Sequence, residues 1–137
     1  MPPITRWYIK TALLYFIGGL LMGIGVMANS SFDLPAVFGT LRPVYIHMLI
    51  VGWLTQLIFG VALWMFPKYS KEKPRGSENL AWTTYLFLNT GLLLRIVGEP
   101  MTALNYQTGW MLAVSAVLQL IAGWVFVMNT WGRVKER

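Results

Sequence analysis

Charged residues in this chain stand in short clusters, and long charge-free stretches separate them. An α-helix needs about 20 mostly apolar residues to cross the hydrocarbon core of a bilayer. Three stretches reach that length, namely Thr11 to Phe32, Pro43 to Pro67 and Pro100 to Gly132, and a fourth, Asn79 to Leu94, reaches it only by continuing across Arg95. The pattern therefore predicts an all-α integral membrane protein with one domain, residues 1–137, and four transmembrane helices at about residues 8–29, 41–66, 78–98 and 107–131.

The overall composition agrees with this prediction and narrows the chemistry. Mean hydropathy is +0.56 and only 12% of the residues are charged, a combination far from that of ordinary soluble domains. The lipid bilayer is therefore the first partner that the sequence predicts. The chain contains no cysteine, which excludes disulfides, thiolate metal sites and a covalently attached c-type haem.

The distribution of basic residues predicts the topology. Nine of the 11 Lys and Arg residues flank the predicted spans on one side, at Arg6, Lys10, Lys68, Lys71, Lys73, Arg75, Arg133, Lys135 and Arg137. Only Arg42 and Arg95 fall on the opposite side. Because short basic loops stay in the cytoplasm, this bias predicts cytoplasmic N- and C-termini, and we expect a bacterial or archaeal plasma membrane. Topology also accounts for the positive charge without a nucleic-acid partner.

Small and amide residues inside the spans predict contacts between helices. Gly19 and Gly23 form a small-xxx-small pair in the first span, which lets another helix approach closely, although membrane helices are also generally rich in glycine. Gln56 and Asn89 lie at depth in the second and third spans, where we expect interhelical hydrogen bonds.

His47 is the only histidine in the chain, and it lies inside the predicted second span. It follows Arg42 by five residues, or about 7.5 Å of helix, so it belongs to the outer leaflet. An ionisable residue inside a span indicates a functional site, and neutral imidazole is a good axial ligand for haem iron. Arg42 and Arg95 share its side of the membrane and are candidates to bind haem propionates. Alternatively, Arg95 pairs with Glu99 at i,i+4, and Arg42 reaches lipid phosphates.

A family resemblance rests on the second predicted span. The run from Arg42 to Trp53, with Phe59-Gly60 and Met65-Phe66-Pro67 further on, resembles the second helix of haem-copper oxidase catalytic subunits, a family that includes nitric oxide reductases. The resemblance implies that His47 is an axial ligand of a low-spin haem near the outer face. That family supplies further histidines for a second haem and for copper, and this chain has none, so the resemblance does not extend to oxygen or nitric oxide reduction.

The resemblance also implies a fold and a mode of assembly. The family's catalytic subunit is built as three arcs of four helices, so a four-span relative looks like one arc completed by self-association. We therefore predict a small membrane b-type cytochrome that binds haem b (protoporphyrin IX iron) in a homo-oligomer and serves electron transfer or haem-based sensing. No catalysis is expected of one chain.

Two assemblies and one different function stay open. A homodimer, which we favour, brings two His47 side chains to one iron, whereas a homotrimer gives a metal or gas-binding site with one histidine each, or a three-histidine metal site. A quinone or a redox protein is a further candidate partner. The alternative function is a non-haem accessory or structural subunit, in which His47 hydrogen-bonds across helices or to a quinone head group.

Overall fold

The computed structural model describes residues 1–71 and 76–134 of the chain, and it is helical throughout its regular elements. The elements are α1 (Pro3–Ala28), α2 (Val37–Thr40), α3 (Arg42–His47), the π-helical segment η1 (Met48–Thr55), α4 (Gln56–Met65), α5 (Glu78–Ala103), α6 (Gly109–Thr130) and the 3₁₀ turn η2 (Trp131–Arg133). No strand occurs in the described ranges. Four of the basic residues used to predict the topology, Lys73, Arg75, Lys135 and Arg137, lie outside those ranges.

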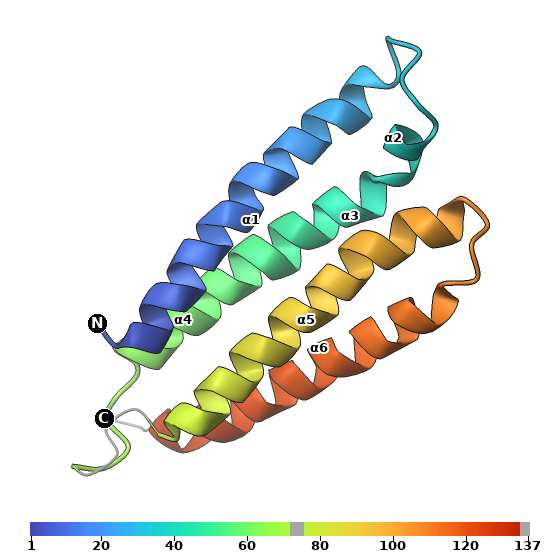
Figure 1. Ribbon diagram of the computed structural model, residues 1–137. Helices are drawn as coiled ribbons and strands as arrows, with labels where there is room; N and C mark the ends of the chain where they lie inside the picture. The colour runs from blue at the N-terminus through green and yellow to red at the C-terminus, as the bar shows by residue number, and fades with distance from the viewer. Residues whose placement is uncertain (72–75, 135–137) are drawn as a thin grey trace.

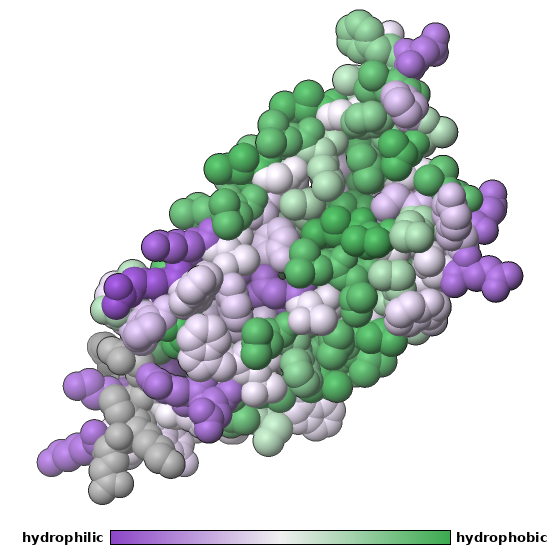
Figure 2. All heavy atoms as spheres, in the orientation of Figure 1, coloured by the Kyte–Doolittle hydropathy of each residue, from purple (hydrophilic) through white to green (hydrophobic). Residues whose placement is uncertain are grey.

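Four helices are long and apolar enough to cross a membrane: Pro3–Ala28, Arg42–Met65, Glu78–Ala103 and Gly109–Arg133. The second of these is the continuous run of α3, η1 and α4, called span two below. The predicted all-α, four-span membrane fold is thereby confirmed. Many large apolar side chains are exposed along the helices, as a lipid-facing surface requires. Figure 2 shows hydrophobic residues along the flanks of the bundle and strongly hydrophilic residues gathered at its ends.

Local sequence signals explain where the helices begin and end. Pro3 opens α1, and Pro43 occupies the first turn of span two, positions where a missing N–H costs nothing. The side chain of Ser77 caps α5 by accepting a hydrogen bond from the backbone N–H of Leu80 at 3.4 Å. The helix α5 differs from its prediction, because it continues through Pro100 to Ala103. Proline lacks an N–H, so this last turn loses one backbone hydrogen bond but keeps helical geometry.

The four spans run side by side as two hairpins, α1 with span two and α5 with α6 (Figure 1). The start of α1, the end of α4, the start of α5 and the end of α6 share one end of the bundle, which we call the Arg133 end. The opposite end, where α1 stops and α3 begins, is called the His47 end. The predicted topology makes the His47 end the outer one.

Glycines let α1 approach span two closely within one chain. A Cβ added to Gly19 would stand 2.9 Å from Cδ2 of Leu49, and one added to Gly23 would meet the ring of Tyr45 at 3.6 Å. Further along, a Cβ on Gly60 would stand 2.7 Å from Cβ of Tyr8. The predicted small-xxx-small contact therefore exists, and its partner is span two of the same chain.

The two predicted interhelical amides behave differently. Gln56 is fully buried, and its Nε2 donates to the backbone carbonyl of Tyr8 in α1 at 3.4 Å, so this prediction is confirmed. Asn89 instead donates to the carbonyl of Tyr85, one turn earlier in its own helix, at 2.8 Å. The interhelical prediction for Asn89 is therefore wrong, because the carbonyl four residues back competes successfully for its amide.

Candidate functional site

His47 is the last residue of α3, directly before the π-helical segment η1. Its Nδ1 lies 2.8 Å from the backbone carbonyl oxygen of Pro43, one turn earlier in the same helix. A carbonyl only accepts hydrogen bonds, so Nδ1 is the protonated nitrogen in this contact and Nε2 carries the lone pair. The helix itself therefore selects the tautomer and points Nε2 away from the backbone. The side chain keeps 29% of its surface exposed.

Arg95 reaches this imidazole from α5. Its Nη1 donates to Nε2 of His47 at 2.9 Å, which joins span two to α5 at the His47 end. Arginine is a permanent donor, so the contact agrees with the tautomer that the Pro43 carbonyl selects. The Arg95 side chain is 22% exposed, so it is partly buried. The sequence predicts similar depths for His47 and Arg95 on one side of the membrane, and the structure brings the two side chains into contact.

Glu99 completes a three-residue cluster, called the outer cluster below, with His47 and Arg95. Its Oε1 lies 2.9 Å from Nε of Arg95 and 3.8 Å from Nδ1 of His47, and the carboxylate is only 10% exposed. The predicted i,i+4 pair of Arg95 and Glu99 is therefore present, together with the contact to His47. Two polar atoms of the pair are nevertheless buried without a hydrogen bond, Nε of Arg95 and Oε2 of Glu99. The Nε–H is close to the carboxylate but is not directed at it.

Arg42 does not join the outer cluster. It is the first residue of α3 and is exposed, and within the described residues it makes no hydrogen bond or ion pair. Five residues of α-helix turn by about 500°, so Arg42 and His47 point about 140° apart around α3. Of the two predicted arginines, only Arg95 contacts His47. The five-residue spacing that separates the directions of Arg42 and His47 could already be seen in the sequence.

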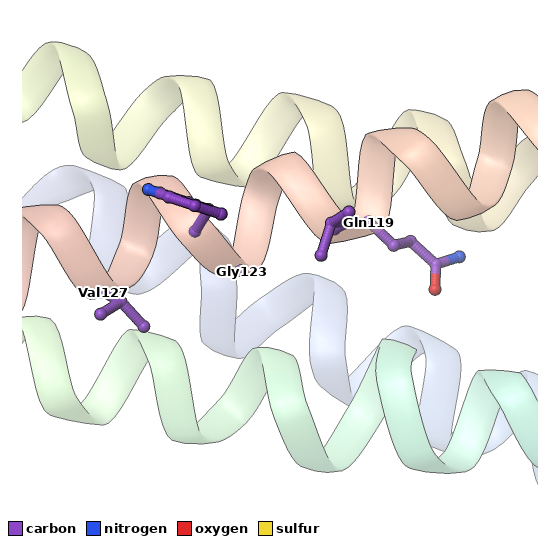
Figure 3. Close-up of a pocket in the computed structure, with 5 residues that line it drawn as sticks. Gln119, Gly123 and Val127 are labelled. Atoms are coloured by element: carbon purple, nitrogen blue, oxygen red, sulfur yellow. The ribbon is translucent and has the colours of Figure 1, made fainter.

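Two grooves on the surface of the helices are separate from His47. One has a volume of about 430 Å³ and is lined only by residues of α6: Gln119, Leu120, Gly123, Trp124 and Val127. Figure 3 shows Gln119, Gly123 and Val127 following one another along this helix. The other, of about 620 Å³, lies between α1 and span two and includes Gly23, Tyr45 and Leu49. Both linings are almost entirely apolar, as expected for surfaces that face lipid or another helix.

The donor set of the outer cluster fits one axial position of haem iron and does not fit a free metal ion. No group of three or more His, Cys, Asp or Glu side chains that could hold a metal occurs in the described ranges. A haem iron held by its porphyrin needs only one or two protein ligands, and a neutral imidazole with its other nitrogen fixed by a carbonyl is suited to that role. Arg95 supplies a cation next to Nε2 of His47. Coordination through Nε2 requires that Arg95 release that atom.

Four apolar helices, with a single imidazole and two cations at one end, define an integral membrane protein related to haem-copper oxidase catalytic subunits. Residues 3–136 match the model of the family described as Cytochrome C and Quinol oxidase polypeptide I, and the chain belongs to that family. The match covers nearly the whole chain, so it extends the resemblance of span two to all four helices. No curated protein and no solved structure matches the chain.

Proposed function

We propose that this chain is a small membrane b-type cytochrome, in which Nε2 of His47 is an axial ligand of haem b. The observation that carries the proposal is the hydrogen bond of 2.8 Å between Nδ1 of His47 and the Pro43 carbonyl, because it leaves Nε2 as the coordinating nitrogen. Membership of the oxidase family supports a haem cofactor. The absence of cysteine excludes covalent c-type attachment, so the haem is held non-covalently, as haem b is.

Each residue of the proposed site has a defined task. The Pro43 carbonyl fixes the tautomer and the plane of the imidazole by accepting a hydrogen bond from its Nδ1–H. Arg95 binds a propionate next to the ligand, and Arg42 binds the second propionate or a lipid phosphate from the exposed start of α3. Haem, when bound, supplies reversible one-electron transfer at its iron.

Self-association supplies what one chain lacks. Each chain has one imidazole, so a six-coordinate iron takes its second ligand from another copy. A homodimer with two His47 ligands is suited to electron transfer with a quinone or a redox protein, and it is the assembly we favour. A homotrimer with one His47 per site leaves an iron position open and is suited to gas binding or sensing. Neither assembly gives one chain a haem-copper reaction.

Visible spectroscopy of the detergent-purified chain tests the ligand. We expect a Soret band after haem reconstitution, a sharp α band on dithionite reduction for the dimer, and loss of both bands in His47→Ala. Tyr45→Phe, a change two residues away that keeps the ring against α1, is the matched control and keeps the spectrum. A wild-type chain without a Soret band after reconstitution contradicts the proposal. The mass of the intact haem-loaded particle separates dimer from trimer.

A second candidate function is favoured by the contact between His47 and Arg95 itself. The bond of 2.9 Å joins span two to α5 with no cofactor, which is the role His47 would have in a non-haem accessory or structural subunit. This alternative predicts no Soret band, together with a loss of thermal stability in His47→Ala. The haem proposal predicts the spectral loss even where His47→Ala folds normally.

The proposed membrane orientation places both termini in the cytoplasm and the His47 end outside. Because the chain has no cysteine, single cysteines report sidedness directly. A membrane-impermeant maleimide applied to intact bacterial cells labels Ser30→Cys, at the exposed turn after α1, and spares Lys71→Cys, at the exposed turn after α4. The reverse labelling pattern contradicts the orientation.

A further inference from the structure

Nε2 of His47 has one lone pair, and in the structure Arg95 uses it. The Nη1 of Arg95 donates to this atom at 2.9 Å. A nitrogen lone pair that accepts a hydrogen bond cannot at the same time coordinate a metal. Access to His47 therefore depends on where Arg95 lies.

Arg95 has a second acceptor within reach. Glu99, one helical turn further along α5, has its Oε1 2.9 Å from Nε of Arg95. The Nε–H makes no hydrogen bond, and Oε2 of the same carboxylate is also buried without one. A buried polar group without a hydrogen bond is energetically costly. Here the donor without an acceptor is Nε–H of Arg95, and the acceptor without a donor is Oε2 of Glu99, so the two belong to adjacent side chains.

Satisfying those two atoms moves Arg95 off His47. The guanidinium is a rigid plane, and a carboxylate pairs best with two parallel N–H groups on one edge of that plane. Directing the Nε–H and an Nη–H at the two oxygens of Glu99 turns the whole plane, and Nη1 turns with it. The site thus has two arrangements, one with Arg95 on His47 and one with Arg95 on Glu99.

We propose that Arg95 is a positioning residue that exchanges between the imidazole of His47 and the carboxylate of Glu99, and so controls whether Nε2 of His47 is available to iron. The role of iron rests on the proposed function, whereas the exchange itself rests on the contacts of the outer cluster. Glu99 acts by drawing Arg95 away, so its removal closes the site and removal of Arg95 opens it.

Diethyl pyrocarbonate tests the exchange without haem. The reagent acylates an imidazole nitrogen that carries a free lone pair, and the chain has a single histidine, so the rise in absorbance of the modified imidazole reports His47 alone. We expect Glu99→Gln to react more slowly than wild type and the double variant Arg95→Leu/Glu99→Gln to react faster. The two variants differ only at Arg95, and we expect their rates to differ by about tenfold, the order set by one hydrogen bond from a charged donor.

The order of the three rates decides the proposal. Equal rates in Glu99→Gln and the double variant show that Arg95 does not cover Nε2, and equal rates in Glu99→Gln and wild type show that Glu99 does not draw Arg95 away. Either result overturns the exchange. A general loosening of the helices raises both variant rates, which is also distinct from the expected order. Tyr45→Phe is the control and keeps the wild-type rate, since the ring of Tyr45 lies against α1 and outside the cluster.

A measurement of haem association separates this inference from the proposed function. The rate of haem association should be lower in Glu99→Gln than in wild type, because Arg95 then stays on His47. The double variant is not used in this measurement, since it also lacks the cation that binds a propionate. The expected acylation order without haem binding by the wild type contradicts the proposed function and keeps the exchange. Normal haem binding that depends on His47, with acylation rates outside the expected order, supports the proposed function and contradicts the exchange.

Discussion

Span two is joined to a neighbouring helix by an arginine at each end of the bundle, and the two arginines differ in what they bind. At the Arg133 end, Arg133 is 1% exposed, and its acceptors include the backbone carbonyls of Leu63 (3.1 Å), Phe66 (2.8 Å) and Pro67 (3.0 Å). At the His47 end, Arg95 is 22% exposed and contacts the side chains of His47 and Glu99.

The difference between the acceptors separates a fixed contact from an exchangeable one. The last carbonyls of a helix have no partner inside the helix, and their positions are set by the backbone. Arg133 satisfies such carbonyls at the end of α4 and holds α6 against them. Side-chain acceptors rotate, and at the His47 end they leave two buried polar atoms without partners. We therefore expect stability to depend on the Arg133 end and chemistry to depend on the His47 end.

The largest expected loss of stability follows from Arg133→Ala. The substitution removes donors from three carbonyls at and just after the end of α4, of which that of Leu63 makes a buried hydrogen bond, and we expect the free energy of unfolding to fall by about 3 kcal/mol. Unfolding of the detergent-solubilised chain, followed by far-UV circular dichroism, measures the change. Arg133→Lys keeps a positive donor but loses the fork geometry, so it should fall between Ala and wild type. A cost for Arg133→Ala below 1 kcal/mol contradicts the description of this end as fixed.

The next largest loss of stability is expected from Gly60→Ala, in the same half of span two. Gly60→Ala places a Cβ 2.7 Å from Cβ of Tyr8, whose side chain is fully buried and cannot move aside freely. We expect a cost of about 2 kcal/mol from this overpacking, measured as for Arg133→Ala. Gly123→Ala is the control, because its Cβ meets nothing within 4 Å, and it should be neutral or stabilising by up to about 1 kcal/mol. Equal effects of the two substitutions contradict close packing of α1 against α4.

A smaller loss is expected from Asn129→Ala, also at the Arg133 end. Asn129 is 7% exposed, accepts from the backbone N–H of Ser77 at 2.9 Å and donates to the Ser77 carbonyl at 3.2 Å. The substitution leaves both backbone groups at the start of α5 without these partners, and we expect a cost of about 1.5 kcal/mol in the same unfolding measurement. Asn129→Asp keeps the acceptor but places a second acceptor oxygen against the Ser77 carbonyl, so it should not recover the loss. A loss of stability larger than that of Arg133→Ala contradicts the predicted order of effects at the Arg133 end.

Sequence reasoning succeeded where one-dimensional patterns carry the information. Charge-free stretches located the four helices, and Pro43 and Pro67 marked the limits of span two, because bilayer thickness and missing N–H groups act locally. The same depth argument placed His47 with Arg95. Glu99 was visible only as an i,i+4 partner of Arg95, and its approach to His47 depends on how α5 is rotated against α3.

The parts that the sequence missed depend on three-dimensional environment. Arg133 was counted only among the basic residues that flank the spans, since such a count does not separate a solvated arginine from one that caps a helix. The π-helical segment at residues 48–55, which packs against α1 and α5, was also not predicted. Asn89 was misassigned because an amide at depth has two acceptable partners, another helix or its own preceding turn.

The smallest effect is predicted for the double variant Arg95→Leu/Glu99→Leu at the His47 end. Removing one partner alone would leave a buried charge, but replacing both by apolar residues is often neutral, because the desolvation cost disappears together with the attraction. The pair is 22% and 10% exposed and leaves two polar atoms unsatisfied, which lowers what it contributes. We expect the free energy of unfolding to stay within about 1 kcal/mol of wild type. A loss equal to that of Arg133→Ala would show that both ends hold the fold equally, and the division between a fixed and an exchangeable arginine would fail.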